Sequence, residues 1–496
     1  MSGPMFAALT ISWVDAFIVF VYLAAVTLMG IWIGRDNKDV SDYLLGDRSL
    51  PWWAVLGSIV ATETSTATFL SVPGIAFAKE GNFSFLQLAF GYVIGRILVS
   101  MWLLPLYFKG QLFTAYEVLH KRFGGLTQKT ASLIFLVTRN LGDSLRLFLT
   151  AIVVKQVTGL SLTASIIIVG ASTVAYTFVG GMKAVVWSDC LQFVIYVGGG
   201  IASLFLIIHM LPGGWQQFSE FAAANQKFRL LDYSLDPTKA YTIWAGIIGG
   251  AMLTMGTHGT DQMMVQRYLC IGSHKGASKA LISSGFVVLA QFALFLMVGV
   301  ALAAFYDFRG TAADLKKNEE FITFIVNEMP RGMVGFTIAA VFSAAMSTLS
   351  SSLNSSAGAV VSDFLQNSGT PEHQVRMTRW MTLFFGILQI VLAIIFVSVS
   401  LDRLIVDQVL AVAGFSSGIL VGVFTLGVTT QRVGQVSAMC GMVAGTAILC
   451  YVKFYTAIAW PWYTLIGAVT TIVFGLLVSL MLDKPTTDAH TAETAP

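Results

Sequence analysis

The sequence predicts an all-α polytopic membrane protein of about 13 transmembrane helices. Of its 496 residues, 56% are apolar and only 11% are charged, whereas about a quarter of the residues in soluble domains are charged. Runs of about 20 mainly apolar residues, the length that crosses a bilayer, recur along the chain. The 46 glycines are small residues of the kind that let membrane helices pack closely.

Thirteen runs are long and apolar enough to be predicted as spans. They cover residues 11–33, 52–77, 84–108, 130–154, 160–179, 184–210, 240–264, 280–305, 333–362, 380–400, 405–430, 434–455 and 460–482. The first run is expected to stay in the protein, because no Lys or Arg precedes it as in a cleavable signal peptide. We expect one transmembrane domain over residues 1–482 and a disordered polar tail over residues 483–496.

The distribution of basic residues predicts which side of the membrane each end occupies. With the N-terminus outside, the loops assigned to the cytoplasm hold fifteen Lys or Arg residues, Arg267 among them, and the short outer loops hold four. Because cytoplasmic loops carry an excess of basic residues, we predict a multi-pass protein of a bacterial inner membrane, with its N-terminus outside and its C-terminus in the cytoplasm.

Composition also excludes several classes of partner and activity. The formal net charge of +3 is too small for a nucleic-acid-binding protein. The four cysteines show no CxxC spacing, so we predict neither a disulfide nor a thiolate metal site. No nucleophile–base pair or metal cluster stands out in the spans, and we do not expect an enzyme.

Two of the predicted spans contain polar interruptions. The span 52–77 holds a hydroxyl-rich stretch with Glu63 before Pro73-Gly74, and the span 240–264 contains Gly249-Gly250 and then the polar run 256–262. Non-helical backbone at membrane depth is tolerated only where protein or a water-filled cavity covers it. We therefore expect both helices to break at mid-membrane depth.

The positions of these interruptions predict an inverted repeat. With span 11–33 set aside as an extra helix, the broken spans are the first and sixth of ten. Matching breaks in two groups of five are typical of transporters whose binding site lies between the broken helices. The first repeat would cover residues 52–210 and the second residues 240–430, followed by two C-terminal helices over residues 434–482. The alternative is that these small and hydroxyl residues only mediate helix packing.

The span 333–362 carries a stripe of hydroxyl groups. Eight of the 14 residues from Ser343 to Ser356 are Ser or Thr, and Ala344, Ser347, Thr348 and Ser351 share one helix face. Neutral oxygen ligands suit a hard cation. Asp189 could add a formal charge, because a carboxylate at membrane depth indicates a functional role. The alternatives are a buried acid held by hydroxyls, or an acid near the interface beside Lys183.

At these residues the chain resembles the sodium:solute symporter family, whose members carry sugars, proline, sialic acid and vitamins. The matching motifs lie between about residues 10 and 450. They are Asp42-Tyr-Leu-Leu-Gly46, Gly180-Gly-x-x-Ala-Val-x-x-x-Asp189, Thr260-Asp-Gln-x-x-x-Gln-Arg267 and Ala344-x-x-Ser347-Thr348.

The resemblance implies a leucine-transporter-like five-plus-five fold and a sodium ion between the first and eighth core helices. The ion would be bound by the carbonyl groups of Ala61, Thr64 and Ala344 and by the hydroxyl groups of Ser347 and Thr348. The sialic acid carriers hold a second sodium with an aspartate and two serines, which correspond here to Asp189, Ser350 and Ser351. Their substrate contacts correspond to Ser65 and Thr68.

Several further side chains are candidates for binding a small solute. Thr66, beside Ser65 and Thr68, and Gln87 in the next helix could hydrogen-bond it near the midplane. Arg139, Asp143 and Arg146 share a helix face, so one arginine could bind a carboxylate bidentately. The alternative is a structural ion triad. His258 could contact the solute, titrate near neutral pH, or pack as a satisfied polar residue.

The departures from the family pattern weaken the case for a sugar. His258 stands about where sugar carriers place a stacking aromatic, and Leu410 matches their glutamine, with Gln408 only close by. Glu63 stands where proline carriers have an acid. Glu63, Asp143, Asp261 and Phe415 are expected to act in coupling or gating.

The sequence thus predicts a sodium-coupled symporter that imports a small organic acid or zwitterion by alternating access. Two alternatives remain. One is a proton-coupled carrier that uses Glu63, Asp189 or His258, and the other is a sensor that binds solute without transporting it. The expected partners are the solute, Na+ and the lipid bilayer, with a monomer as the expected state.

Overall fold

The computed structural model describes residues 12–34, 40–109, 112–311, 315, 319–365, 370–398 and 405–483. These residues form helices joined by loops, the longest of them between Ala224 and Ala245, and a lone bridge between Ser49 and Ile271 is their one β-type pairing. The predicted tail beyond residue 483 lies outside the described residues. The all-α prediction is confirmed.

The helices follow one another along the chain in this order. They are α1 (Trp13–Gly34), α2 (Val40–Leu45), η1 (Gly46–Arg48), α3 (Trp52–Glu63), α4 (Thr66–Phe77), η2 (Phe83–Phe85), α5 (Leu86–Trp102), α6 (Leu104–Tyr107), α7 (Glu117–Phe123), α8 (Gly125–Thr158), α9 (Leu162–His209), α10 (Gly214–Ala224), η3 (Ala245–Gly249), α11 (Gly250–Gly259), α12 (Gln262–Leu269), α13 (His274–Arg309), α14 (Glu320–Glu328), α15 (Met333–Asp363), α16 (Pro371–Val397), α17 (Ile405–Thr429), α18 (Gln435–Tyr455), η5 (Trp460–Trp462) and α19 (Tyr463–Leu482).

Fewer continuous helices than the predicted 13 have the length and apolar character of a span. Among the described residues there are nine, or up to eleven when two sharply bent pairs are each taken as one span. The bent pairs are α3 with α4, at 60°, and α8 with the first part of α9, at 115°. The predicted span 240–264 is absent from this set because it is divided into η3, α11 and α12, each too short to cross a bilayer.

The first predicted break lies between α3 and α4. Thr64 and Ser65 leave the helical conformation, with ψ angles of 90° and 175°, and the chain turns by 60°. Pro73 lies inside α4 and does not end it. A helix that ends at Glu63 leaves its last carbonyl groups without intrahelical donors, so oxygen atoms become free for other contacts.

The second predicted break lies between α11 and α12. Thr260 and Asp261 separate the two helices, and the Asp261 carboxylate caps α12 by accepting a hydrogen bond from the Met263 amide at 2.9 Å. Upstream, η3 is a π-helical turn that runs directly into α11. The two predicted interruptions are therefore both present in the structure.

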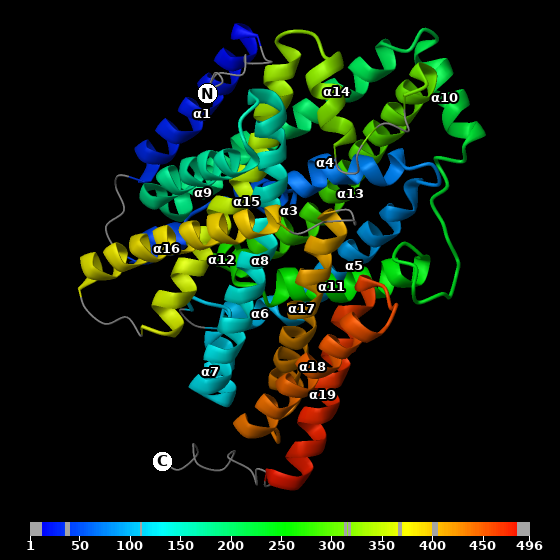
Figure 1. The fold of residues 1–496 in the computed structure, drawn as a ribbon. Coiled ribbons are helices and arrows are strands. Elements are labelled where there is room, and N and C mark those ends of the chain that lie inside the picture. Colours follow the sequence, from blue (N-terminus) through cyan, green and yellow to red (C-terminus); the bar gives the residue numbers. More distant parts are fainter. Residues whose placement is uncertain are drawn as a thin grey trace.

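The broken helices surround α15, which runs through the middle of the molecule beside α9 and α3 (Figure 1). Most of α15 is buried, including its hydroxyl-rich stretch. α18 and α19 lie side by side at one edge, and α1 lies along α9 and α15 (Figure 1). α9 is kinked at Gly181, whose φ of 65° is a conformation that glycine adopts readily.

Candidate functional site

The break after α3 meets α15 through a direct hydrogen bond. The Thr348 hydroxyl donates to the Thr62 carbonyl oxygen at 2.9 Å and lies 3.3 Å from the Ala344 carbonyl oxygen of its own helix. The Ser347 hydroxyl beside it is buried and has no hydrogen-bond partner among the described residues. Three of the five residues predicted for the first sodium, Ala344, Ser347 and Thr348, thus lie against the broken helix.

The other two residues predicted for this sodium lie on the broken helix itself. Ala61 and Thr64 are fully buried. The Thr64 hydroxyl accepts a hydrogen bond from the Gln291 amide of α13, so this side chain points towards α13. The carbonyl group that meets Thr348 belongs to Thr62, a residue to which the sequence analysis assigned no role.

Asp189 lies in a second cluster beside the first. Its carboxylate is fully buried, and its Oδ2 atom accepts hydrogen bonds from the Ser58 hydroxyl at 2.5 Å and the Thr62 hydroxyl at 3.2 Å. Lys183, the predicted interfacial neighbour, pairs with Asp42 instead, at 2.6 Å. Asp189 therefore belongs to the protein interior and not to the membrane interface.

The cation in this cluster is Arg267 of α12. Its Nη2 atom lies 3.1 Å from Asp189 Oδ2, donates to the Thr62 hydroxyl at 2.6 Å and contacts the Ser351 hydroxyl. Its Nε atom donates to the Ser58 hydroxyl at 2.9 Å. The prediction that Arg267 lies in a cytoplasmic loop is wrong, because Arg267 belongs to α12 and only 1% of its surface is exposed. A guanidinium at this depth needs a carboxylate, and Asp189 supplies it.

Arg267 takes the place predicted for the second sodium. Of the three residues proposed to bind that ion, Asp189 and Ser351 meet around the guanidinium, whereas the Ser350 hydroxyl donates to the Ser347 carbonyl of its own helix at 3.2 Å. The Asp189 Oδ1 atom is buried with no hydrogen-bond partner in the described part of the chain. The carboxylate that a second sodium would need is therefore already paired with Arg267.

Thr62 joins the two clusters. Its carbonyl group faces Thr348, while its hydroxyl contacts Asp189 and Arg267 and lies 3.3 Å from the Ser351 hydroxyl. These ligands are mainly neutral oxygen atoms with one carboxylate, the type of group that a hard monovalent cation prefers. The residues present therefore fit sodium.

A central cavity opens between the two broken helices. It contains about 680 Å³ of space not filled by atoms, part of it continuous with solvent. Its walls come from α3, α4, η2, α5, α8, α11, α12, α13 and α17. The lining residues are Thr62, Glu63, Thr68, Phe85, Tyr92, Arg139, Arg146, Leu253, Thr257, His258, Met263, Met264, Phe292, Val406, Leu410 and Ala413.

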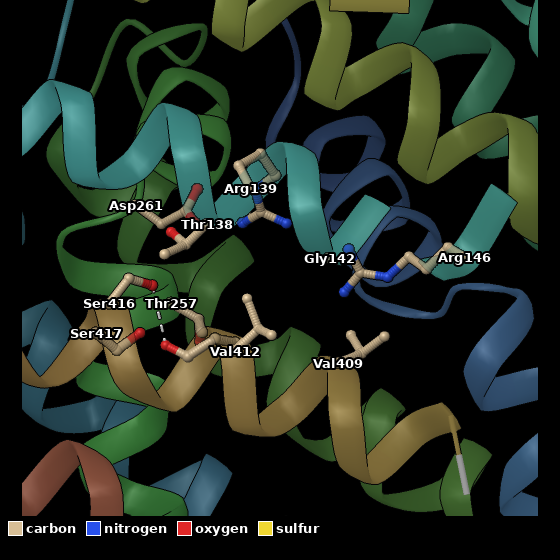
Figure 2. A pocket seen from close by; sticks show the side chains of 11 residues that line it. Thr138, Arg139, Gly142, Arg146, Thr257, Asp261, Val409, Val412, Ser416 and Ser417 are labelled. Atoms are coloured by element: carbon tan, nitrogen blue, oxygen red, sulfur yellow. Dashed lines mark hydrogen bonds and ion pairs between the residues drawn. The ribbon is translucent and has the colours of Figure 1, made fainter. Parts of the chain in front are cut away.

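A smaller space adjoins this cavity between α8, α11 and α17 (Figure 2). Arg139 and Arg146 line both spaces, which places them at their boundary. In Figure 2 the Arg139 side chain lies close to Asp261, and Arg146 lies further along the same helix. A solute in the central cavity would therefore meet two guanidinium groups on one wall.

The charged residues of the cavity form three pairs. Arg139 contacts Asp261, Arg146 contacts Asp143, and Arg96 contacts Glu63. The predicted triad on α8 is thus two separate pairs, because Asp261 from the second break takes Arg139. In each pair a side chain keeps limited exposure, at 12% for Arg139, 13% for Arg146 and 16% for Glu63, whereas Asp143 and Arg96 are fully buried.

His258 is surrounded by three polar neighbours. Its Nε2 atom lies 3.1 Å from Arg96 Nη2 and 3.4 Å from Glu63 Oε2. Its Nδ1 atom lies 2.8 Å from the Tyr268 hydroxyl. His258 lines the cavity with both of its nitrogen atoms already engaged.

Several predicted solute contacts lie outside the cavity lining in this structure. The Thr66 hydroxyl is bonded to the Thr150 hydroxyl at 2.9 Å. Gln87 donates to the Ser84 and Tyr241 carbonyl groups, both at 3.1 Å. Ser65 is buried at the break. Phe415, predicted for coupling or gating, is partly buried and packs against the main hydrophobic core. Thr68 is the hydroxyl residue of α4 that lines the cavity.

No functional role was predicted for Arg96, although its position inside an apolar span indicated one. An arginine inside an apolar span requires an acidic partner, and Glu63 was the acid still without one. Ser58, one helical turn before Thr62, offered no comparable signal, because a serine inside a helix is common in membrane proteins.

Comparison with known proteins places this geometry in a family. The model of the sodium:solute symporter family matches residues 43–445, most of the chain. The chain belongs to the sodium:solute symporter family. This symporter is 29% identical over 471 residues to the sodium/sialic acid symporter NanT of Aliivibrio fischeri, with 93% of this chain and 92% of that protein covered. It is 28% identical to the human sodium/iodide cotransporter, with 86% and 67% covered.

Solved structures agree with this assignment. A Na+-coupled sialic acid symporter in a substrate-bound, outward-open state matches the symporter with a TM-score of 0.87 and 25% identity, over 95% of this chain and 99% of that one. The transporter MhsT in complex with L-phenylalanine, at a TM-score of 0.53 and 15% identity, matches in fold, with 87% of this chain and 99% of that one covered. The leucine-transporter-like fold is confirmed. The symporter is therefore a sodium-coupled membrane transporter and not an enzyme.

Proposed function

We propose that this symporter imports a small organic acid or zwitterion together with sodium by alternating access. The observation that carries the proposal is the hydrogen bond from the Thr348 hydroxyl to the Thr62 carbonyl, beside the unpartnered Ser347 hydroxyl. It joins the broken helix to α15 through oxygen atoms. An ion bound by Ala61, Thr64, Ala344, Ser347 and Thr348 would stabilise one arrangement of these two elements and thereby bias the conformational equilibrium.

A second sodium at Asp189 would compete with Arg267. Both cations need the same carboxylate, and Ser351 already contacts the guanidinium. Sodium binding there would require Arg267 to move away, and ion release would allow it to return. In this scheme Arg267 neutralises Asp189 when the ion is absent, which avoids an unpaired buried charge.

The central cavity favours a solute with an anionic end and an apolar body. Arg139 and Arg146 both face it, and a guanidinium binds a carboxylate bidentately. Eight of the sixteen lining residues are apolar, among them Phe85, Phe292, Leu253, Met264, Val406 and Leu410, and the rest include Thr62, Thr68, Thr257 and Tyr92. A polyhydroxylated sugar would leave hydroxyl groups unpaired against the apolar side chains, which costs binding energy.

The membrane orientation belongs to the same proposal. With the N-terminus outside and the C-terminus in the cytoplasm, the break between α3 and α4 lies at mid-membrane depth, and solute taken up from outside is released to the cytoplasm of a bacterial cell. We propose the monomer as the transporting unit.

Two measurements on the purified protein test the proposal. A thermal-shift screen against organic acids, amino acids, sugars and vitamins, in sodium and in potassium, should show stabilisation by a carboxylated solute that is stronger in sodium. In proteoliposomes, an inward sodium gradient should drive uptake of the radiolabelled form of that solute. Uptake driven equally well by a pH gradient alone would favour a proton-coupled carrier, and solute binding without uptake would favour a sensor.

A further inference from the structure

The first helix of the chain contains two buried polar residues that the transport mechanism does not use. α1 lies outside residues 43–445, the part of the chain that the family model matches. Only 17% of its most apolar stretch is buried against the rest of the protein, so most of its surface faces lipid. Asp15 and Tyr22 are exceptions, at 2% and 6% exposed. A polar side chain buried in a mainly lipid-facing helix indicates a specific contact with the protein.

Asp15 anchors the start of α1 to the start of α15. Its Oδ1 atom accepts hydrogen bonds from the Gly332 and Gly335 amides, both at 2.7 Å. A Cβ atom at position 335 would lie 2.6 Å from the Asp15 backbone, so only glycine allows this approach. α1 is thereby attached to the helix that carries Ala344, Ser347 and Thr348.

Tyr22, two helical turns further along, lies between the two helices that carry the predicted sodium ligands. Its hydroxyl accepts a hydrogen bond from the Gln192 amide of α9 at 3.2 Å and lies 4.0 Å from the Met346 sulfur atom of α15. Gln192 follows Asp189 by one helical turn, and Met346 immediately precedes Ser347. A single hydroxyl group thus touches α9 and α15 directly beside their cation-binding residues.

The surroundings of this hydroxyl leave little room for rearrangement. Ser343 of α15 is a further polar neighbour of Tyr22, and Val26, Ala339 and Met346 pack around the ring. The Gln192 Oε1 atom is buried without a hydrogen-bond partner among the described residues. Loss of the tyrosine hydroxyl would leave the Nε2 group of Gln192 unpaired in addition to its Oε1 atom. Two unpaired buried groups in one side chain favour a shift of α9 relative to α15.

We propose that Tyr22 is a positioning residue for sodium binding, which holds α15, the helix of Ala344, Ser347 and Thr348, in place against α9. The proposal rests on the sodium site described under the proposed function. α1 then sets the sodium affinity of the transporter without contacting the ion or the solute. Ion ligands must be placed within about 0.5 Å to be effective, so a small shift between the two helices weakens binding.

The test is Tyr22→Phe, which removes one oxygen atom and keeps the ring. The sodium concentration for half-maximal uptake should rise about two- to twelvefold, because one buried hydrogen bond contributes about 0.5–1.5 kcal/mol. The maximal rate and the solute KM at saturating sodium should stay unchanged. Tyr451→Phe, on a lipid-facing part of α18, is the matched control and should leave the sodium dependence as in the wild type.

A second variant separates positioning from simple stabilisation. Gln192→Leu removes the same hydrogen bond from the α9 side, and the double variant should shift the sodium dependence by less than the sum of the single shifts. A lower melting temperature with unchanged half-saturation by sodium in Tyr22→Phe would overturn the proposal. Thr348→Val, measured in parallel, distinguishes failure of the proposed role of Tyr22 from failure of the proposed sodium site. Unchanged sodium dependence in Tyr22→Phe alone rejects the role of Tyr22, whereas no change in either variant rejects the sodium site and the role of Tyr22 with it.

Discussion

Arg267 Nη2 lies 3.1 Å from Asp189 Oδ2, and both side chains are almost completely buried. The pair connects one half of each broken helix, because Ser58 and Thr62 of α3 also contact the guanidinium of Arg267 in α12. Ser351 adds α15 to the same group. The cation of this cluster is therefore part of the chain, and a sodium ion bound to Asp189 would have to replace it.

Substitution of Asp189 by Asn should destabilise the protein strongly. The change leaves the buried Arg267 without an anionic partner, which costs about 3–5 kcal/mol. The apparent melting temperature of the purified protein in detergent should fall clearly. The double variant Asp189→Asn/Arg267→Gln should lose less than the sum of the two single losses. Strictly additive losses would mean that the two groups do not interact.

Removal of either hydroxyl at the first sodium site should weaken sodium binding. Ser347→Ala and Thr348→Ala should each raise the sodium concentration for half-maximal uptake about tenfold, the equivalent of about 1.4 kcal/mol. Ser355→Ala is the matched control on the same helix, because its hydroxyl donates to the Ser352 carbonyl group at 3.1 Å. If all three variants behave alike, the ion is bound elsewhere.

Substitution of the cavity arginines by lysine should weaken solute binding without changing sodium dependence. Arg139→Lys and Arg146→Lys keep the positive charge but lose the planar pair of donors that matches a carboxylate. The KM of a carboxylated solute should rise about tenfold or more in at least one of them. Arg309→Lys, at an exposed pair with Glu328, should be neutral. A wild-type KM in both cavity variants would exclude arginine as the solute anchor.

Glu63→Gln tests both the buried pair and the proton-coupled alternative. Arg96 is fully buried beside Glu63, so loss of the negative charge should cost stability by about 3–5 kcal/mol. The protein that folds should still use a sodium gradient. Glu220→Gln on the exposed face of α10 is the control. If the Glu63→Gln variant is as stable as the wild type but its solute uptake no longer responds to the ion gradient, Glu63 is instead the proton carrier.

Replacement of sodium by potassium should lower the stability of the wild-type protein. A ligand that binds only the folded state at about 100 times its Kd stabilises by about 2.7 kcal/mol. A melting curve over a sodium titration at constant ionic strength should rise and then level off. Thr348→Ala should shift this rise to higher sodium concentrations, and equal melting temperatures in the two salts would argue against a sodium site.

Many residues of the site could be predicted because they are polar side chains inside segments that are otherwise apolar enough to span the membrane. Glu63, Asp189, Arg139 and the serines of α15 are polar groups at membrane depth, and such groups require partners or a function. The two helix breaks could be predicted from the same polar residues, since unsatisfied backbone groups must face protein or water. Membership of the family followed from short motifs around these residues and was confirmed by the comparison over residues 43–445.

The pairing of the charges could not be predicted in the same way. Arg267 was assigned to a loop because it follows an apolar run, yet α12 turns it inward to Asp189. Arg139 was grouped with Asp143 by helical spacing, but Asp261 reaches it from a distant segment. Thr66 and Gln87 were candidates for solute binding, but their side chains are hydrogen-bonded to Thr150 and Tyr241, which lie far along the chain.

The sequence by itself therefore determined the membrane-spanning class, the two interruptions and the chemical type of the ligands, because each is a local property of polarity along the chain. Only the tertiary structure decided which carbonyl group meets Thr348, which cation neutralises Asp189, and that α1 reaches both α9 and α15 through Tyr22. These are contacts between residues at least 78 positions apart, and helix packing, not sequence spacing, sets their distances.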